Sequence, residues 1–218
     1  MKKAVSEGKV YLWLNPGEYN VDGCAGKTLT INGTKDSVLK VMNEGEDGCD
    51  YGFGSGGSGV GNITFNGVTI DTTANNGNYK GYAYMNATFN NCNFFGSYTS
   101  HYVQTYNNCY FDFNNGYFWI WGAEKVTFNN CEFGGNSKNI LAHGWASSVI
   151  NINSCKFAAD EKGYANGGTV WTAAVEIDPA GTNIYTINFT GENTINENYA
   201  GWTRIKDGST GHNITGLN

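Results

Sequence analysis

A short phrase that recurs through the middle of the chain constrains its fold more than any other feature. In its clearest copies the phrase reads aromatic-Asn-Asn-Cys-x-Phe, and two looser copies flank these. The copies begin 24, 17, 22 and 24 residues apart (Phe65, Phe89, Tyr106, Phe128 and Ile152). Recurrence about every 20 to 25 residues is typical of stacked structural units, each of which contacts only its neighbours. The phrase therefore predicts a solenoid and not a globular domain with one closed core.

Within the phrase, the alternation of apolar and polar residues predicts a strand that ends in a bend. We expect Val126 and Phe128 to point inward, Thr127 to point outward, and Asn129-Asn130 to bend the chain. Asparagines at the same bend of consecutive units can hydrogen-bond along the solenoid axis, which compensates for backbone groups left unpaired at a corner. Stacking predicts an asparagine ladder (Asn66, Asn90, Asn107, Asn129, Asn153), a buried phenylalanine column (Phe94, Phe111, Phe133, Phe157) and a buried cysteine column (Cys92, Cys109, Cys131, Cys155).

The composition supports a single all-β domain over residues 1–218. Glycine and asparagine, 31 of each, suit a fold with many tight bends because both tolerate left-handed backbone conformations. The chain is 15% aromatic and 40% hydrophobic, which is enough for a core, and no long run has the helical 3.6-residue period. We expect a glycine-rich loop at 44–60. Cys24 and Cys49 lie outside the cysteine column and are candidates for a disulfide.

Further strands are expected on both sides of the repeats. The chain opens with a strand at 9–14, a Pro16-Gly17 turn and an alternating strand at 28–33, and later strands are expected near its end (169–177, 185–189 and, as the final edge, 203–206). The opening elements resemble the first turns of right-handed parallel β-helices of the pectate-lyase-like superfamily. The resemblance implies an all-β, single-stranded right-handed parallel β-helix, for which we expect about seven to nine rungs. Families with this fold include lyases, hydrolases, adhesins and phage tail proteins, so the resemblance implies no single activity.

The charge pattern argues against two classes of partner. The net charge is −6 and Arg204 is the only arginine, whereas sequence-independent binding of nucleic acid requires many basic side chains. No apolar stretch approaches the roughly 20 residues of a membrane-spanning helix, and no apolar leader segment follows Met1. We therefore expect neither a nucleic-acid partner nor membrane insertion. We expect a domain excised from a longer extracellular or bacterial cell-surface protein, with its leader outside this chain, or alternatively a virion protein.

The segments between the repeats supply a candidate binding face. Counting back seven and nine residues from two of the repeats places Trp121 beside Trp145 and Trp119 beside His143 on adjacent rungs, and alternation turns these side chains outward. A strip of exposed tryptophans offers a flat apolar surface to the C–H faces of a sugar ring, and an imidazole can bind its hydroxyls. The predicted carbohydrate-binding face comprises Trp119, Trp121, His143, Trp145 and Trp171. The alternative is that these tryptophans pack beneath loops.

Two carboxylates beside this face raise the possibility of catalysis. Glu176 and Asp178 are two residues apart on one expected strand, which places their carboxyl groups about 7 Å apart on one face. Glycoside hydrolysis requires a separation of roughly 5 to 9.5 Å, although any such pair of residues satisfies it. A polysaccharide lyase would need calcium-binding aspartates and a basic residue beside them, and Arg204 lies far from any acidic cluster. Because the chain has neither a metal-ligand spacing nor a cofactor motif, we expect no metal and no cofactor.

We therefore expect a non-catalytic surface or adhesin-type module that binds carbohydrate through the aromatic face. One alternative is a polysaccharide-degrading glycoside hydrolase that uses Glu176 and Asp178. Another is a structural stalk or phage virion protein in which loops or partner chains cover the outward aromatic residues. Outward Thr and Asn residues suggest an ice-binding lattice, but regular Thr-x-Thr ranks are missing. The sequence determines neither the identity of the ligand nor the oligomeric state.

Overall fold

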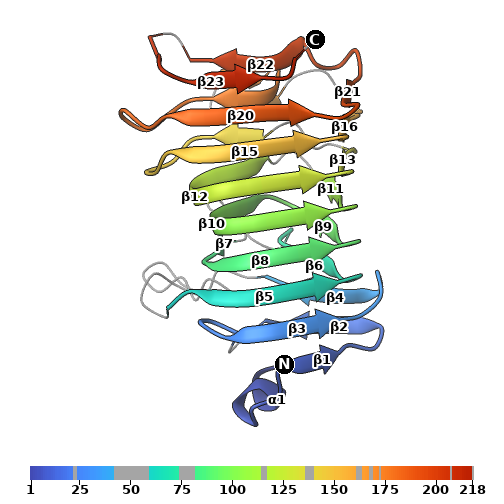
Figure 1. Ribbon diagram of the computed structural model, residues 1–218. Coiled ribbons are helices and arrows are strands. Elements are labelled where there is room, and N and C mark those ends of the chain that lie inside the picture. Colours follow the sequence, from blue (N-terminus) through green and yellow to red (C-terminus); the bar gives the residue numbers. More distant parts are fainter. Residues whose placement is uncertain are drawn as a thin grey trace.

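In the computed structural model, parallel strands stack along one axis from β1 (Tyr11–Trp13) to β22 (Gly201–Ile205) and β23 (Asn213–Thr215), as Figure 1 shows. The structure describes residues 1–21, 24–41, 59–73, 82–113, 117–135, 140–160, 164–166, 169–171, 173–206 and 208–217. Cys49 and most of the expected loop at 44–60 lie outside these residues. A disulfide between Cys24 and Cys49 therefore stays a prediction.

Two parallel sheets contain nearly all the strands of the described residues. Besides β1, β22 and β23, the larger sheet contains β3 (Thr28–Asn32), β5 (Gly61–Asn66), β7 (Tyr82–Ala83), β8 (Met85–Asn90), β10 (Tyr98–Asn107), β12 (Phe118–Asn129), β14 (Ile140–Ala142), β15 (Ser148–Asn153), β19 (Ala173–Ile177) and β20 (Tyr185–Thr190). The smaller sheet contains β2 (Gly17–Asn20), β4 (Ser37–Lys40), β6 (Thr69–Asp71), β9 (Asn93–Phe95), β11 (Tyr110–Asp112), β13 (Glu132–Phe133), β16 (Lys156–Phe157) and β21 (Thr194–Ile195).

The larger sheet consists of two stacks that are joined through β10 and β12. The first residues of these two strands pair with β7 and β14, whereas their last residues pair with β8 and β15. We call one stack the ladder face; it consists of β1, β3, β5, β8, the ends of β10 and β12, β15, β20 and β23. The stack with β7, the starts of β10 and β12, β14, β19 and β22 is the tryptophan face. Between them the pairing of β10 with β12 shifts register twice, which marks a corner.

The interior is built from the predicted columns. Phe94, Phe111, Phe133 and Phe157 are buried and stack ring on ring, with centroids 4.8, 4.6 and 4.6 Å apart. A second aromatic stack stands beside the first, with centroids 4.6, 4.9 and 5.1 Å apart (Phe65, Phe89, Tyr106 and Phe128). The cysteine column is also buried, and its four thiols form no disulfide (Cys92, Cys109, Cys131 and Cys155). The phrase is therefore scaffold, as its alternation predicts.

The asparagine ladder is confirmed and is longer than predicted. Each amide donates through Nδ2 to the Oδ1 of the asparagine on the preceding strand, at 2.8 to 2.9 Å for four bonds and 3.4 Å for the last (Asn32, Asn66, Asn90, Asn107, Asn129 and Asn153). The residue after the ladder position takes a left-handed conformation, with φ between 51° and 55° (Asn91, Asn108, Asn130, Ser154). Asparagine tolerates this conformation better than most residues, which explains the Asn-Asn pair in the phrase. Parallel pairing and the ladder are consistent with a β-helix.

The corner between the ladder face and the tryptophan face lengthens over four successive rungs and is one residue shorter on the last. Residues paired at its two sides lie six, eight, ten and twelve positions apart on successive rungs (Ser100 and Tyr106, Ile120 and Phe128, Ala142 and Ile152, Ile177 and Phe189). Counting back from the repeat assumes a corner of constant length and therefore errs by two residues across it. Trp119 pairs with Leu141 and not with His143, which corrects the predicted alignment.

The ends of the fold differ in detail from the expected strands. The expected strand at 169–177 is two elements, of which β18 (Thr169–Trp171) pairs antiparallel with β17 (Tyr164–Asn166) and β19 joins the tryptophan face. The final strand of the ladder face is β23, beyond the expected edge at 203–206. At the other end a short helix, α1 (Lys2–Ser6), packs Val5 against the core. In the part of the chain that the structure describes, no helix has the length and apolar character to cross a membrane.

Candidate functional site

The tryptophan face carries an outward row of side chains that crosses four strands. Strand pairing aligns Trp119 of β12, Leu141 of β14, Glu176 of β19 and Arg204 of β22. The expectation that Trp119 is exposed is wrong, because only 6% of it is accessible. Its ring packs with Leu141 and Tyr117 in a small apolar cluster separate from the main core. Trp119 thus lies on the outer side of the strand, as alternation predicts, but offers no free ring face.

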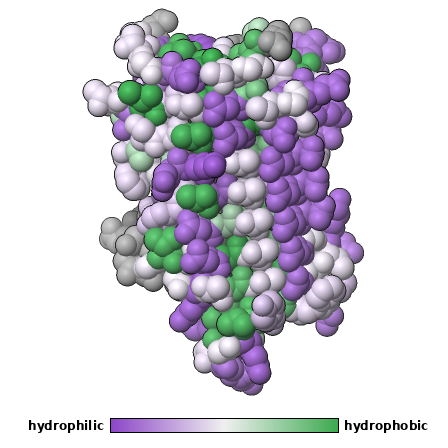
Figure 2. Space-filling view, in the orientation of Figure 1, coloured by the Kyte–Doolittle hydropathy of each residue, from purple (hydrophilic) through white to green (hydrophobic). Residues whose placement is uncertain are grey.

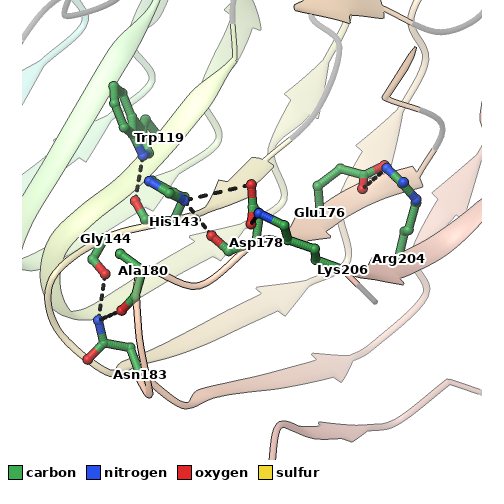
Figure 3. Close-up of polar contacts among 9 residues, drawn as sticks. All are labelled: Trp119, His143, Gly144, Glu176, Asp178, Ala180, Asn183, Arg204 and Lys206. Atoms are coloured by element: carbon green, nitrogen blue, oxygen red, sulfur yellow. Dashed lines mark hydrogen bonds and ion pairs between the residues drawn. The ribbon is translucent and has the colours of Figure 1, made fainter. Parts of the chain in front are cut away.

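His143 connects this row to the corner. Its carbonyl oxygen accepts a hydrogen bond from the indole Nε1 of Trp119, and its ring lies 5.5 Å from that of Trp121 between centroids. Its Nδ1 is hydrogen-bonded to the carbonyl oxygen of Asp178 and lies 3.9 Å from a carboxylate oxygen of the same residue. Figure 3 shows His143 between Trp119 and Asp178. The structure therefore brings together Trp119, Trp121, His143 and Asp178, four of the predicted site residues.

Both predicted catalytic carboxylates have cationic partners. Glu176 is 2% exposed, and its carboxylate accepts a hydrogen bond from the backbone N–H of Ala173 at 2.9 Å and lies 3.3 Å from the Arg204 guanidinium. Asp178 lies 2.7 Å from the Lys206 ammonium. Figure 3 shows the two ion pairs side by side. Both carboxylates are therefore held in ion pairs between β19 and β22, which corrects the expectation that Arg204 lies far from any acidic cluster.

Trp145 is the exposed member of the predicted group, with 58% of its surface accessible. It lies in the segment between β14 and β15, beside Trp121 and Gly122 of β12. Its backbone N–H donates to the carbonyl oxygen of Trp121 at 3.0 Å, while its ring lies over Gly122. A Cβ at Gly122 would lie 2.6 Å from that ring and 2.8 Å from the ring of His101. The missing side chain of Gly122 therefore allows the indole to approach the backbone at the corner.

Beneath Trp145, the buried His101 forms the floor of the corner. Its ring is 1% exposed and stacks on Tyr84, with centroids 3.9 Å apart. Burial removes the imidazolium from water and lowers the pKa of His101 to about 4. At neutral pH the ring is therefore uncharged, and the interior of the corner carries no positive charge there.

Two features hold the corner segment after β14 in place. Gly144 passes so close to β12 that any Cβ would overlap the carbonyl oxygen of Trp121. The amide of Asn183 donates hydrogen bonds to the carbonyl oxygens of Gly144 at 2.6 Å and Ala180 at 2.8 Å, which ties two successive corners together (Figure 3). Trp145 is thus carried by a segment fixed on both sides. The backbone that carries the ring therefore needs little reordering when a ligand binds.

Three further aromatic residues lie outside the corner, one of them predicted as a site residue and two not. Trp171 is the last residue of β18, where it pairs with Tyr164, and its side chain lies outside what the structure describes. Sequence reasoning missed Tyr11 and Trp13 of β1, which are 77% and 72% exposed. The alternation around the buried Leu12 was the signal that could have identified them. Across the described ranges, no group of three or more His, Cys, Asp or Glu side chains could hold a metal ion.

The fold and the corner define an all-β protein of parallel strands in stacked sheets, with an asparagine ladder and an exposed indole at one corner. Comparisons with protein-family models, curated proteins and solved structures find no match. The assignment of the fold class therefore rests on the parallel strand pairing and on the asparagine ladder.

Proposed function

We propose that the protein is a non-catalytic surface module that binds carbohydrate at the corner formed by Trp121, His143 and Trp145. The observation that carries the proposal is the Trp145 ring, which is 58% exposed although one of its edges approaches the backbone at Gly122. Sugar rings present C–H faces that pack on such an indole, and hydroxyl groups that bind to polar side chains nearby. The half-buried His143 and Asp178 lie across the same corner and supply those polar groups.

A binding role accounts for the two carboxylates better than catalysis does. Glu176 and Asp178 each have a cationic partner, from Arg204 and Lys206 of β22, so both ion pairs tie β19 to the last strand of the tryptophan face. Removing one partner of the buried pair would leave a charge uncompensated. This gives Glu176 a structural reason to be present that needs no substrate.

The finer features of the fold belong to the same proposal. We infer a right-handed helix of about seven to nine rungs, similar to the pectate-lyase-like superfamily, with an extracellular or cell-surface location. The parallel pairing and the asparagine ladder support this reading.

The test is a glycan array followed by calorimetric titration of each ligand found. Trp145→Ala should lower the affinity for the bound glycan by about tenfold or more, because it removes the ring on which the sugar packs. Trp145→Tyr, which keeps a flat aromatic ring, is the matched control and should retain most of the binding. Equal affinities for wild type and Trp145→Ala would refute the proposed site.

The same sample decides between binding and hydrolysis. Release of reducing sugar from a panel of polysaccharides, abolished by Glu176→Gln, would show that the protein is a glycoside hydrolase and would overturn the non-catalytic part of the proposal. Glycan binding without turnover would support it. Circular dichroism of Glu176→Gln is needed in parallel, because this variant also weakens the ion pair with Arg204.

A further inference from the structure

The ladder face carries a second, independent arrangement of side chains that points to a ligand. Outward threonines align in a column beside the asparagine ladder, each two residues before a ladder asparagine (Thr30, Thr64, Thr88, Thr105 and Thr127). The pattern Thr-x-Asn therefore recurs in register on five successive strands, whereas the pattern Thr-x-Thr does not recur in this way. The columns repeat about every 4.8 Å across the strands and stand about 6.6 Å apart along them. In Figure 2 a hydrophilic column and a paler one run side by side over the stacked strands.

These columns have hydrogen-bonding capacity that the protein does not use. No hydrogen bond within the described residues involves the hydroxyl groups of Thr30, Thr64, Thr88 or Thr105. Each ladder bond takes one N–H and one lone pair of an asparagine amide, which leaves a second N–H and a second lone pair. The face therefore presents donors and acceptors at regular intervals along the solenoid axis.

A shallow depression of about 490 Å³ lies over the threonine column. Its polar lining includes most of the threonine column together with Asn62 and Asn86, which stand on the side of that column away from the ladder, and its apolar lining includes Val103. None of the described residues that line it is charged. The depression therefore suits a neutral ligand with many hydroxyl groups and not an ionic one.

Two exposed aromatic rings lie on the N-terminal strand β1, at one end of the threonine and asparagine columns. Tyr11 pairs with Thr30 and Trp13 pairs with Asn32, so each ring continues one column. They are 77% and 72% exposed, although aromatic side chains of this size usually pack in the core or at interfaces. An aromatic platform at the end of a polar, uncharged track is a pattern suited to sugar rings.

We propose that the ladder face binds a neutral polysaccharide chain laid along the solenoid axis. Sugar rings at one end stack on Tyr11 and Trp13, and the hydroxyls of the following sugars bind the threonine and asparagine columns. From β1 to the end of β12 the track crosses six strands and is about 24 Å long, which accommodates several sugar residues. This site shares no residue with the corner at Trp145 and stands or fails separately from it.

The experiment measures calorimetric affinity of the full chain for neutral cello-, xylo-, manno- and chito-oligosaccharides of increasing length. For at least one series, affinity should rise with length until the chain spans the track. Trp13→Ala should then lower it about tenfold, and Thr64→Val combined with Thr88→Val should lower it further. Valine replaces the hydroxyl with a methyl group and suits a strand, so these variants should fold. Thr186→Val, the same change at an outward position of β20 beyond the track, is the matched control and should leave this binding unchanged, while Trp145→Ala reports on the corner site in the same titrations.

The other outcomes are also decisive. If only Trp145→Ala reduces binding, the ladder-face proposal is overturned while the corner site stands. If no oligosaccharide of any series binds, or if affinity is independent of length and of Trp13, the ladder face is not a glycan track. Ice shaping that Thr64→Val abolishes, without glycan binding, would overturn the proposal and assign the face to ordered water.

Discussion

Acidification should weaken the fold through His101, the histidine buried beneath Trp145. Its ring is 1% exposed, lies against Tyr84 on one side and approaches Gly122 on the other. Burial is the main cause that lowers its pKa from 6.5 to about 4, while a hydrogen bond with the backbone of Thr99 acts in the opposite direction. Protonation inside the fold would place a charge in an apolar setting, whereas the unfolded chain accepts the same proton in water.

The sign and size of the effect follow from these two pKa values. Because the unfolded state binds the proton more readily, the contribution is complete above pH 6.5 and is lost as the pH falls towards 4. At 1.36 kcal/mol for each unit between the two values, the free energy of unfolding should fall by about 3 kcal/mol over that range. Asp71 acts at lower pH. Burial raises the pKa of its carboxyl, but hydrogen bonds from Lys40 and Thr73 outweigh this and hold it below 3.8.

The measurement is urea unfolding at a series of pH values from 7.5 to 4. His101→Phe keeps an aromatic ring against Tyr84 but cannot be protonated, so its stability should be nearly constant over this range. His212→Gln removes a histidine that is much less buried and should retain most of the fall. If wild type and His101→Phe lose the same stability between pH 6.5 and 4, His101 is not the group responsible. Glycan binding at the corner should weaken in parallel, because the ring of Trp145 lies beside that of His101.

Two further predictions concern the scaffold. Phe133→Ala should lower the free energy of unfolding by about 3 to 5 kcal/mol, because the Phe133 ring is fully buried between those of Phe111 and Phe157, with centroids 4.6 Å from each. Urea unfolding measures this loss, and the control Phe133→Leu should lose less than about 1.5 kcal/mol. Equal losses for the two variants would contradict the prediction. Asn107→Ala removes two ladder bonds of 2.8 Å and should cost about 1 to 3 kcal/mol in the same assay; a loss below about 0.5 kcal/mol would show that the ladder contributes little.

The sequence was sufficient for the interior because each column depends on local alternation. Thr127, Phe128 and Asn129 occupy the same positions relative to the bend as their counterparts in other repeats, so a count along one strand places them correctly. Strand pairing then repeats the pattern from rung to rung. The ladder and the phenylalanine and cysteine columns therefore needed no knowledge of the loops.

The candidate site was less predictable because it lies across a corner. The predicted alignment of Trp119 with His143 is wrong because the corner within β12 is two residues shorter than the corner between β14 and β15. Nothing in the local sequence pattern gives these lengths. The burial of Trp119 depends on tertiary packing with Leu141 and Tyr117, which alternation cannot show. Tyr11 and Trp13, by contrast, could have been identified, because the alternation that placed Leu12 inside also placed them outside.

The stepwise growth of that corner has a consequence for how such a chain can vary. Its length grows by two residues at three successive steps, but on the last rung it is one residue shorter, because Ile205 pairs with Ile177 while Thr215 pairs with Asn188. Pairing on both flanking strands is kept through all of these changes, and Ile214 still pairs with Ile187. Segments of different length can therefore be exchanged at this corner without any change in the paired strands on either side. The corner is a position at which new binding surfaces can arise while the interior stays the same.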